Sequence, residues 1–385
     1  MNKHWQTVAL GEVLNRTENF EKREEFTEYH FAGTYSFARG IFASIIKSGS
    51  EFKLDKIQRV NAGNFVYCKI MAWEGAFGLV PYELDNYVMS GAFVAYEIDT
   101  SRLEPKFLSY FFKKPSTWQS IGSQSSGTNV RRQSLHPHQF EKAKISLPSL
   151  TEQRRIVARI EALVVKVEEV KRLRKEIIDD NQNMLLGVYH KLIENADYQP
   201  MTTVAPLIRR PVTEIDNEKY YPELGVRSFG NGTFHKASIK GVEMGTKRIY
   251  EFAPNDLVFS NVFAWEGAIA VAKQEDAGRF GSHRFITCVP KENLALSSFL
   301  AFHFLTRKGL EQIGDASPGG AGRNRTLGLT KLEVLKVPVP AIEKQQWFDG
   351  LLQKTNAIKQ HQAETQQQLN ALLPAILDRA FKGEL

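Results

Sequence analysis

The sequence predicts an α/β (α+β) protein in which two tandem-repeated globular domains are separated by two long antiparallel helices, with approximate two-fold symmetry. Three observations support this fold class. The peptide Ala-Trp-Glu-Gly-Ala occurs at 72–76 and again at 264–268, and further matches recur along the whole chain at the same offset of 192 residues. Each repeat is about half of the 385 residues, which is the size of a domain. Each repeat also ends in a stretch of helical periodicity with little Gly or Pro.

The first part of each repeat, residues 1–150 and 196–342, is predicted to be a compact domain that mixes strands and helices. Short β-type runs alternate with turns rich in Gly, Pro and Asn, and helical patches interrupt them. The clearest strand-like runs are 64–70 and 256–262, and the clearest helical patches are 107–112 and 298–304.

The second part of each repeat, residues 151–195 and 343–385, is predicted to be one long helix. In the first of these, apolar residues recur in steps of four and three, at Ile156, Ile160, Leu163, Val167 and Val170. Ser149 and Glu152 fit a capping box at its start. In the second helix the middle of the apolar seam is polar, and Pro374 is expected to break or kink the helix near its end.

A lone helix of about 40 residues cannot be stable in water on helix propensity alone. The two helices share one register under the offset of 192 residues, so we expect them to pack on each other as an antiparallel pair. The alternative is that each helix folds back on its own domain.

Charge and composition favour an anionic partner in an intracellular setting. The net charge of +7 and the pI near 9.1 point first to nucleic acid, while many other proteins are also mildly basic. Cys68 and Cys288 are not equivalent in the repeat, which argues against a disulfide framework or a structural zinc site. No stretch approaches the ~20 apolar residues that span a bilayer, and the first residues lack a signal-peptide core. We therefore expect a cytoplasmic protein without membrane contact.

The residues that enzymes need are largely missing. There is no Pro-Pro for the base-binding loop of a methyltransferase and no GxxxxGK[ST] phosphate loop. Asp85 with Glu104 and Lys106 is a faint match to a metal-dependent nuclease, but the second repeat lacks it. His136 and His138 have no partners at metal-ligand spacing, which favours a surface position. We expect neither catalytic nor metal-binding residues in this chain.

Polar loops in both repeats are the candidate DNA contacts. Arg can bind guanine, and Asn or Gln can bind adenine, through paired hydrogen bonds, and short side chains allow an approach to phosphates. The alternative is a solvated surface loop. His283 and Arg284 replace Gly91 and Ala92 of the first repeat, as expected for two domains that read different sequences. The candidate DNA-binding residues are Arg39, Asn129, Arg131, Arg132, Gln133, Asn231, His283, Arg284, Arg323, Asn324 and Arg325.

The repeated Trp and Glu side chains have two interpretations each. Trp73 and Trp265 lie beside β-type runs, so core packing is favoured over stacking on DNA. Glu74 and Glu266 either anchor the local turn or accept hydrogen bonds from cytosine. These four residues are therefore structural or DNA-contacting candidates.

Several motifs together resemble the specificity subunit of Type I DNA restriction–modification systems. They are Leu-Gly-Val-Arg-Ser-Phe-Gly-Asn-Gly-Thr-Phe at 224–234, the two Ala-Trp-Glu-Gly-Ala peptides, Leu-Pro-Ser-Leu-Thr-Glu-Gln at 147–153, and the C-terminal run 373–385. The resemblance covers the whole chain. In the first repeat the Gly-Val-Arg-Ser-Phe signature is reduced to Gly-Thr-Tyr-Ser-Phe at 33–37, which leaves Arg227 without a counterpart.

The resemblance implies a chain that catalyses nothing itself and whose two target recognition domains each read one half of a split, asymmetric double-stranded DNA sequence. Two modification subunits, which bind S-adenosylmethionine and methylate adenine, would dock on it, and restriction subunits would join them. S-adenosylmethionine, ATP and Mg are then expected on partner subunits. An antiparallel helix pair gives the two domains an approximate two-fold axis, which suits the two-fold relation of the DNA backbones. Alternatives are the specificity subunit of a nuclease-free adenine methyltransferase and a general DNA-binding scaffold protein.

Overall fold

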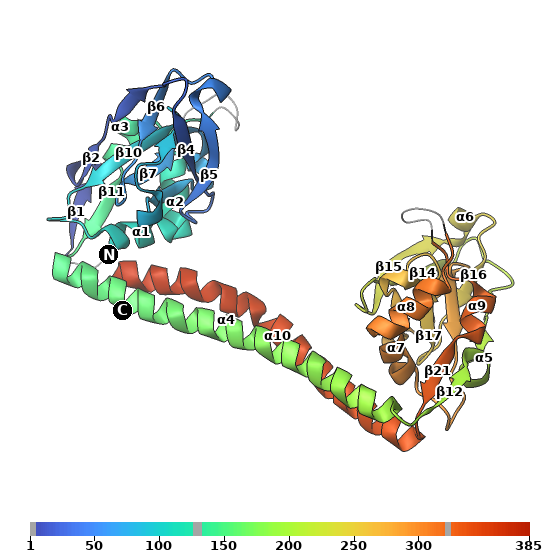
Figure 1. The fold of residues 1–385 in the computed structure, drawn as a ribbon. Coiled ribbons are helices and arrows are strands. Elements are labelled where there is room, and N and C mark those ends of the chain that lie inside the picture. Colours follow the sequence, from blue (N-terminus) through green and yellow to red (C-terminus); the bar gives the residue numbers. More distant parts are fainter. Residues whose placement is uncertain (1–4, 126–132, 320–324) are drawn as a thin grey trace. The chain divides into compact units, whose positions relative to one another are not determined.

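The computed structural model describes residues 5–125, 133–319 and 325–385. They form two compact units, which are Met1–Leu173 with Glu364–Leu385, and Arg174–Ala363. Each unit contains one domain of mixed strands and helices and part of each long helix, α4 (Leu150–Ile193) and α10 (Ile342–Lys382) (Figure 1). Domain one runs from β1 to β11 and domain two from β12 to β21. No helix in the described ranges is long and apolar enough to cross a membrane.

Domain one contains three sheets, with strand orders β1-β11, β2-β10-β7-β8 and β3-β6-β9-β4-β5. The strands are β1 (Gln6–Ala9), β2 (Leu14–Arg16), β3 (Phe20–Lys22), β4 (Glu28–Thr34), β5 (Ile41–Ser48), β6 (Lys56–Arg59), β7 (Phe65–Cys68), β8 (Phe77–Leu79), β9 (Val88–Met89), β10 (Phe93–Ile98) and β11 (Lys144–Leu147). The helices are η1 (Leu10–Glu12), η2 (Gly49–Glu51), η3 (Lys69–Glu74), η4 (Tyr82–Leu84), α1 (Pro105–Lys113), α2 (Pro115–Gly122) and α3 (Pro137–Lys142), where η denotes a 3-10 helix.

The main core of domain one lies between its four-stranded sheet and helices α1 to α3. Strand β7 is buried along its whole length, as expected for an apolar run with a sheet neighbour on each side. Its Phe65 and Tyr67 pack with Phe77, Phe112 and Phe140, and the ring centroids of Phe65 and Phe112 are 4.7 Å apart. Burial of each such ring stabilises the folded state by roughly 1.5–3 kcal/mol relative to leaving the ring exposed.

Domain two contains sheets with strand orders β12-β21, β13-β20-β17-β18 and β15-β14-β19-β16. The strands are β12 (Asp197–Pro200), β13 (Leu207–Ile208), β14 (Tyr220–Val226), β15 (Thr233–Lys240), β16 (Ile249–Glu251), β17 (Leu257–Ser260), β18 (Ile269–Val271), β19 (Phe280–Ser282), β20 (Phe285–Cys288) and β21 (Lys336–Val339). The helices are α5 (Met201–Val204), α6 (Gly241–Met244), η6 (Ala264–Glu266), η7 (Gln274–Asp276), α7 (Ser297–Leu305), α8 (Arg307–Asp315) and α9 (Leu329–Val334).

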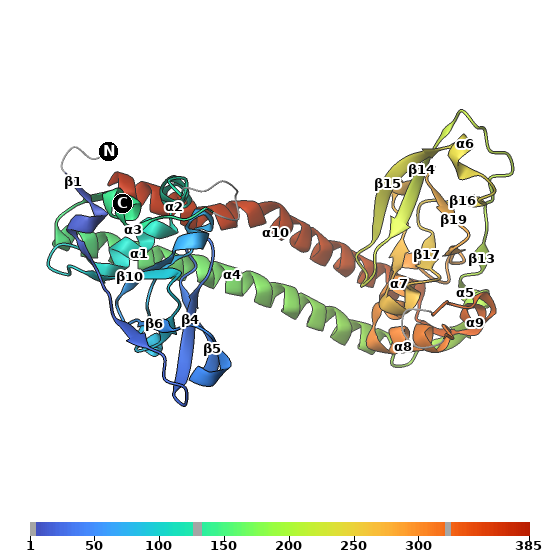
Figure 2. The ribbon, with the colours of Figure 1, turned by 90° about the horizontal axis from the view of Figure 1, so that it is seen from above.

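The repeat predicted from the sequence extends to the pairing of individual residues. Parallel pairing joins Phe31 to Val88 in domain one and Glu223 to Phe280 in domain two. Each residue of the second pair lies 192 positions after its counterpart in the first. The hairpins β4–β5 and β14–β15, both visible in Figure 2, carry a register shift at equivalent positions. Within the described residues, β3 is an additional strand of the domain-one sheet.

The two long helices pack on each other in both units. In the first unit, Ile156 and Ile160 near the start of α4 share a core with Leu377 and Ala380 near the end of α10. In the second unit, the end of α4 shares a core with Phe348 near the start of α10. Since each helix start meets the other helix's end, the predicted antiparallel pairing is confirmed.

Two details of the helices refine the prediction. Of the break or kink expected at Pro374, the break does not occur, because α10 continues to Lys382. Proline removes one backbone hydrogen bond, and the last turns of α10 are held by burial of Leu377 and Ala380 in the core of domain one. The capping box is half formed, because the Ser149 hydroxyl accepts from the backbone N–H of Glu152 at 3.4 Å. The Glu152 carboxylate instead binds the Arg155 guanidinium at 2.7 Å.

A buried glutamine joins each domain to the helix that follows it. Gln153 accepts from the backbone N–H of Glu104 at 2.8 Å and donates to the carbonyls of Arg102 and Pro148, both at 2.9 Å. Gln345 makes the equivalent three bonds in domain two, at 2.8–3.0 Å. Both side chains are fully buried. Such satisfied polar groups fix the direction in which the helix leaves the domain.

Candidate nucleic-acid interface

The repeated Ala-Trp-Glu-Gly-Ala peptide forms a 3-10 turn in each domain. The turn ends at Gly75 (φ 79°) or Gly267 (φ 76°), where a left-handed backbone favours glycine. The indole N–H of Trp73 donates to the Ile70 carbonyl at 3.1 Å, and that of Trp265 to the Val262 carbonyl at 2.9 Å. Both Trp side chains are half-buried, and Trp265 packs against the core of domain two.

Glu74 and Glu266 each hold a hairpin loop against this turn. In domain one, the Ser36 hydroxyl donates to the Glu74 carboxylate at 2.9 Å, and the backbone N–H of Phe37 donates to the Glu74 carbonyl at 2.7 Å. In domain two, Ser228 donates to the Glu266 carboxylate at 3.3 Å, and the Phe229 N–H donates to its carbonyl at 2.8 Å. The repeated peptide therefore fixes the loop of β4–β5 or β14–β15.

Arg39 and Asn231 occupy equivalent positions on these two hairpin loops, and both are exposed. The Arg39 Nε–H donates to the Ser36 carbonyl at 3.1 Å, and the Asn231 amide donates to the Ser228 carbonyl at 2.9 Å. The two side chains close their loops in the same way while presenting different polar groups to solvent.

His283 and Arg284 are the exposed two-residue turn between β19 and β20. The backbone N–H of Asn261 donates to the Arg284 carbonyl at 2.8 Å, and the Lys69 N–H donates to the Ala92 carbonyl at the same distance in domain one. Asn261 also accepts from the backbone N–H of Leu327 at 2.8 Å, which ties this turn to the segment that begins at Arg325. The backbone framework is thus the same in both domains, and the side chains on it differ.

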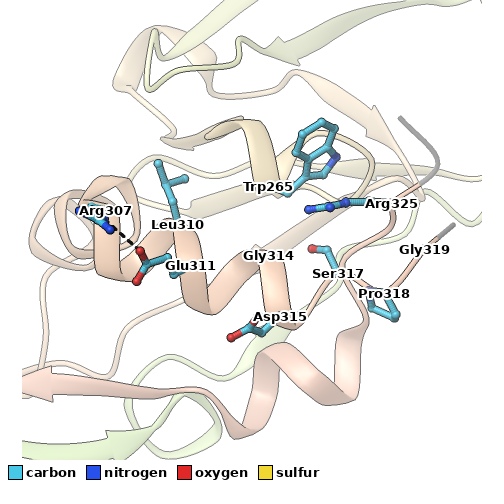
Figure 3. A pocket seen from close by; sticks show the side chains of 10 residues that line it. All are labelled: Trp265, Arg307, Leu310, Glu311, Gly314, Asp315, Ser317, Pro318, Gly319 and Arg325. Carbon is cyan, nitrogen blue, oxygen red and sulfur yellow. Dashed lines mark hydrogen bonds and ion pairs between the residues drawn. The ribbon is translucent and has the colours of Figure 1, made fainter. Parts of the chain in front are cut away.

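Arg325 lies over the ring of Trp265, with its guanidinium carbon 5.4 Å from the ring centroid. Both residues line a pocket of about 820 Å³ beside α8, together with Arg307, Glu311 and Ser317 (Figure 3). Arg307 is paired with Glu311 at 3.0 Å. The geometry allows the Arg325 guanidinium to bind an anionic or planar group at the mouth of this pocket.

The structure brings some of the predicted residues together, and others lie outside the described residues. In domain two, Arg325, the repeated turn, the hairpin loop and the 283–284 turn are joined by the contacts above. In domain one, Gln133 is half-buried just before Leu135, whose N–H donates to the Lys69 carbonyl at 3.0 Å. Five predicted residues lie outside the described residues: Asn129, Arg131, Arg132, Arg323 and Asn324.

The candidate metal-site and nuclease residues of the described part of the chain are engaged in other contacts or stand apart from one another. No group of three or more His, Cys, Asp or Glu side chains within them could hold a metal ion. Glu104 pairs with Arg154 and Lys106 with Glu161, so two of the three side chains of the faint nuclease motif bind α4. Burial raises the pKa of both cysteine thiols, that of Cys288 to about 12.

Three exposed hairpin-loop residues were not among the candidate DNA contacts predicted from the sequence. Phe37 and Phe229 have left-handed backbone angles and project from equivalent positions, and the recurrence of Ser-Phe at the offset of 192 could have identified them. Arg227, which had no counterpart by position, stacks over the Phe234 ring at 4.8 Å.

Comparisons with known proteins place these features in a family. Residues 2–178 match the model of the Type I restriction modification DNA specificity domain. The Type I restriction enzyme StySPI specificity subunit of Salmonella potsdam is 21% identical over 319 residues, which are 74% of this chain and 66% of that protein. The alignment thus spans just under two thirds of that relative's length.

Two solved structures have the same fold as this chain. The HsdS subunit from Thermoanaerobacter tengcongensis superimposes with a TM-score of 0.64 and 22% identity, covering 100% of this chain and 98% of that one. A structure described as the basis of complex assembly and conformational transition of the type I R-M system has a TM-score of 0.70 and 21% identity, with 100% and 99% covered.

Proposed function

The chain belongs to the Type I restriction–modification specificity subunits, and we propose that it reads a split double-stranded DNA target through its two domains while docking two modification subunits. Specificity subunits are the non-catalytic members of these systems. Adenine methylation and DNA cleavage would therefore take place on partner chains. S-adenosylmethionine would be bound by the modification subunits, and the restriction subunits would join the same assembly.

The observation that carries this proposal is one backbone framework built twice with different loop side chains. The backbone bond that the 91–92 and 283–284 turns accept is 2.8 Å long in both domains, yet one turn carries Gly-Ala and the other His-Arg. Base edges in the major groove are distinguished by the donors and acceptors of such side chains. Two copies of one reader with different contact residues would read two different half-sites.

Docking of modification subunits is supported by apolar side chains that remain exposed on the long helices. On α4 these include Val165, Leu173 and Ile177, and on α10 they include Trp347 and Leu372. Exposed apolar residues along paired helices are a common feature of protein–protein contact surfaces. These positions are therefore the first to substitute in a test of modification-subunit binding.

Methylome sequencing of the host with and without this gene tests the proposal. We expect the loss of one methylated adenine motif made of two defined parts around an unspecified spacer. Restoration by the gene on a plasmid would establish that this chain directs the methylation. A methylome that is unchanged by deletion, or the loss of a continuous motif, would contradict bipartite reading by this subunit.

A further inference from the structure

Both hairpin loops hold a phenylalanine in a conformation that L-residues seldom adopt. Phe37 has φ 63° and Phe229 has φ 61°. Their exposed fractions are 61% and 79%, so most of each ring faces solvent. A left-handed position in a loop is usually occupied by Gly or Asn, because a larger side chain is strained there. A bulky apolar residue at this position in both domains calls for a role outside the fold.

Internal packing does not account for these rings. The Phe37 ring touches Trp118 only edge-on, with the centroids 6.0 Å apart. The loop itself is held by the Ser–Glu bond and by backbone bonds to the repeated turn, which do not involve the phenyl group. The framework therefore fixes the backbone position from which each ring extends into solvent.

Each loop also places one arginine on an aromatic ring. In domain one, the Arg39 guanidinium carbon is 5.2 Å from the Tyr35 ring centroid, and in domain two Arg227 is 4.8 Å from that of Phe234. The two arginines come from different positions of the repeat, but both are exposed beside the left-handed phenylalanine. In each loop a carboxylate, that of Glu74 or Glu266, accepts a hydrogen bond from the serine hydroxyl.

We infer that these two loops make the same sequence-independent contact with duplex DNA, the phenyl ring on the sugar or a base-pair step and the guanidinium on a phosphate. The inference rests on the proposed function and adds residues to it. Contacts that read different half-sites should differ between the domains, whereas contacts with the common backbone should be retained in both. Proteins that bind a duplex without recognising its bases often combine an apolar side chain inserted at a base-pair step with a neighbouring arginine.

The test measures how full-length variants bind a mixed-sequence duplex and a duplex that carries the methylated target. Phe37→Ala and Phe229→Ala should each weaken binding to both duplexes by the same factor, on the order of tenfold, and leave the salt dependence unchanged. Arg39→Ala and Arg227→Ala should also weaken both, and each should reduce the slope of log affinity against log salt by about 0.9. The preference for the target should not change in any of the four.

Phe26→Ala and Tyr220→Ala are matched controls, because both rings are exposed in the same domains but lie off these loops. They should bind both duplexes as the parent chain does, and all six variants should melt at the parent temperature. Unchanged affinity of the loop variants for both duplexes, or a loss confined to the target duplex, overturns the inference. Loss of modification-subunit binding with intact DNA affinity would assign the loops to a protein partner instead. If the parent chain itself shows no preference for the target, the proposed function fails separately.

Discussion

The docking of domain two on α4 should weaken in mild acid, because it depends on a buried neutral histidine. His303 of α7 is 1% exposed. Its Nδ1 lies 2.6 Å from the Tyr189 hydroxyl of α4, and its Nε2 lies 3.0 Å from the Gln312 Oε1 of α8. The Gln312 amide donates to the Lys336 carbonyl, so its oxygen faces His303 and accepts. His303 therefore carries its proton on Nε2 and accepts the Tyr189 O–H at Nδ1.

The size of the effect follows from the pKa. Burial, with a smaller contribution from the Lys308 charge, lowers the pKa of His303 from 6.5 to about 4. Each pKa unit corresponds to about 1.4 kcal/mol. When His303 is protonated in the unfolded chain but not in the folded one, the free energy of unfolding therefore falls by up to roughly 3 kcal/mol. The unfolded chain binds the extra proton below pH 6.5. The stability contribution of neutral His303 is therefore complete above pH 6.5 and decreases progressively as the pH falls to 4.

The repeat supplies the matched variant. Tyr189 corresponds to Phe381 and His303 to Phe111 at the offset of 192, and those two rings pack at 5.6 Å in the first unit. Tyr189→Phe with His303→Phe would copy this apolar contact into the second unit. The double variant should lose the acid sensitivity, whereas Tyr189→Phe alone leaves Nδ1 unpaired and should cost about 1–3 kcal/mol at pH 7.

Amide hydrogen exchange of α7 and urea unfolding of the full chain, each at pH 7 and pH 5, measure these changes. Protection of α7 relative to α1 should drop at pH 5 in the parent and stay constant in the double variant, with α1 as the internal reference. Equal pH dependence in the parent and the double variant would refute the assignment of the effect to His303.

Three further outcomes follow from the structure. His283→Gly with Arg284→Ala should change the methylated sequence of one half-site only, as measured by methylome sequencing. The melting temperature measured by calorimetry should stay within a few degrees of the parent. A change in both half-sites would contradict separate reading by the two domains. Gln345→Ala should destabilise the second unit by about 2–4 kcal/mol and Gln153→Ala the first, because three backbone groups lose a partner in each, and exchange protection would locate the loss. Cys68 and Cys288 should react with a thiol reagent only after unfolding, since both are buried, so labelling of the native chain at neutral pH would contradict their placement.

The repeat, the mixed domains and the paired helices could be predicted because each leaves a periodic or duplicated signal. The continuation of α10 past Pro374 could not be predicted, because it depends on the burial of neighbouring residues by domain one, which is far away in sequence. Glu74 was identified as a residue of interest, but its bond to Ser36 depends on a loop that follows β4, 38 residues earlier in the sequence. The offset of 192 also gave Arg227 no equivalent in domain one, because the arginine that lies on an aromatic ring of that hairpin is Arg39, at a different position of the repeat.

The location of the hydrogen bonds explains how one framework can carry different readers. The turns at 91–92 and 283–284 are fixed by backbone N–H and carbonyl groups, which every residue type other than proline supplies. Their side chains make no contribution to those bonds, so substitutions there should alter stability by no more than about 0.5 kcal/mol. The serine, glutamate and glutamine contacts, by contrast, use side chains and join equivalent residues in both domains. The proposed recognition residues would thus be separated from structural residues within the same few loops, and the target could change without a cost to the fold.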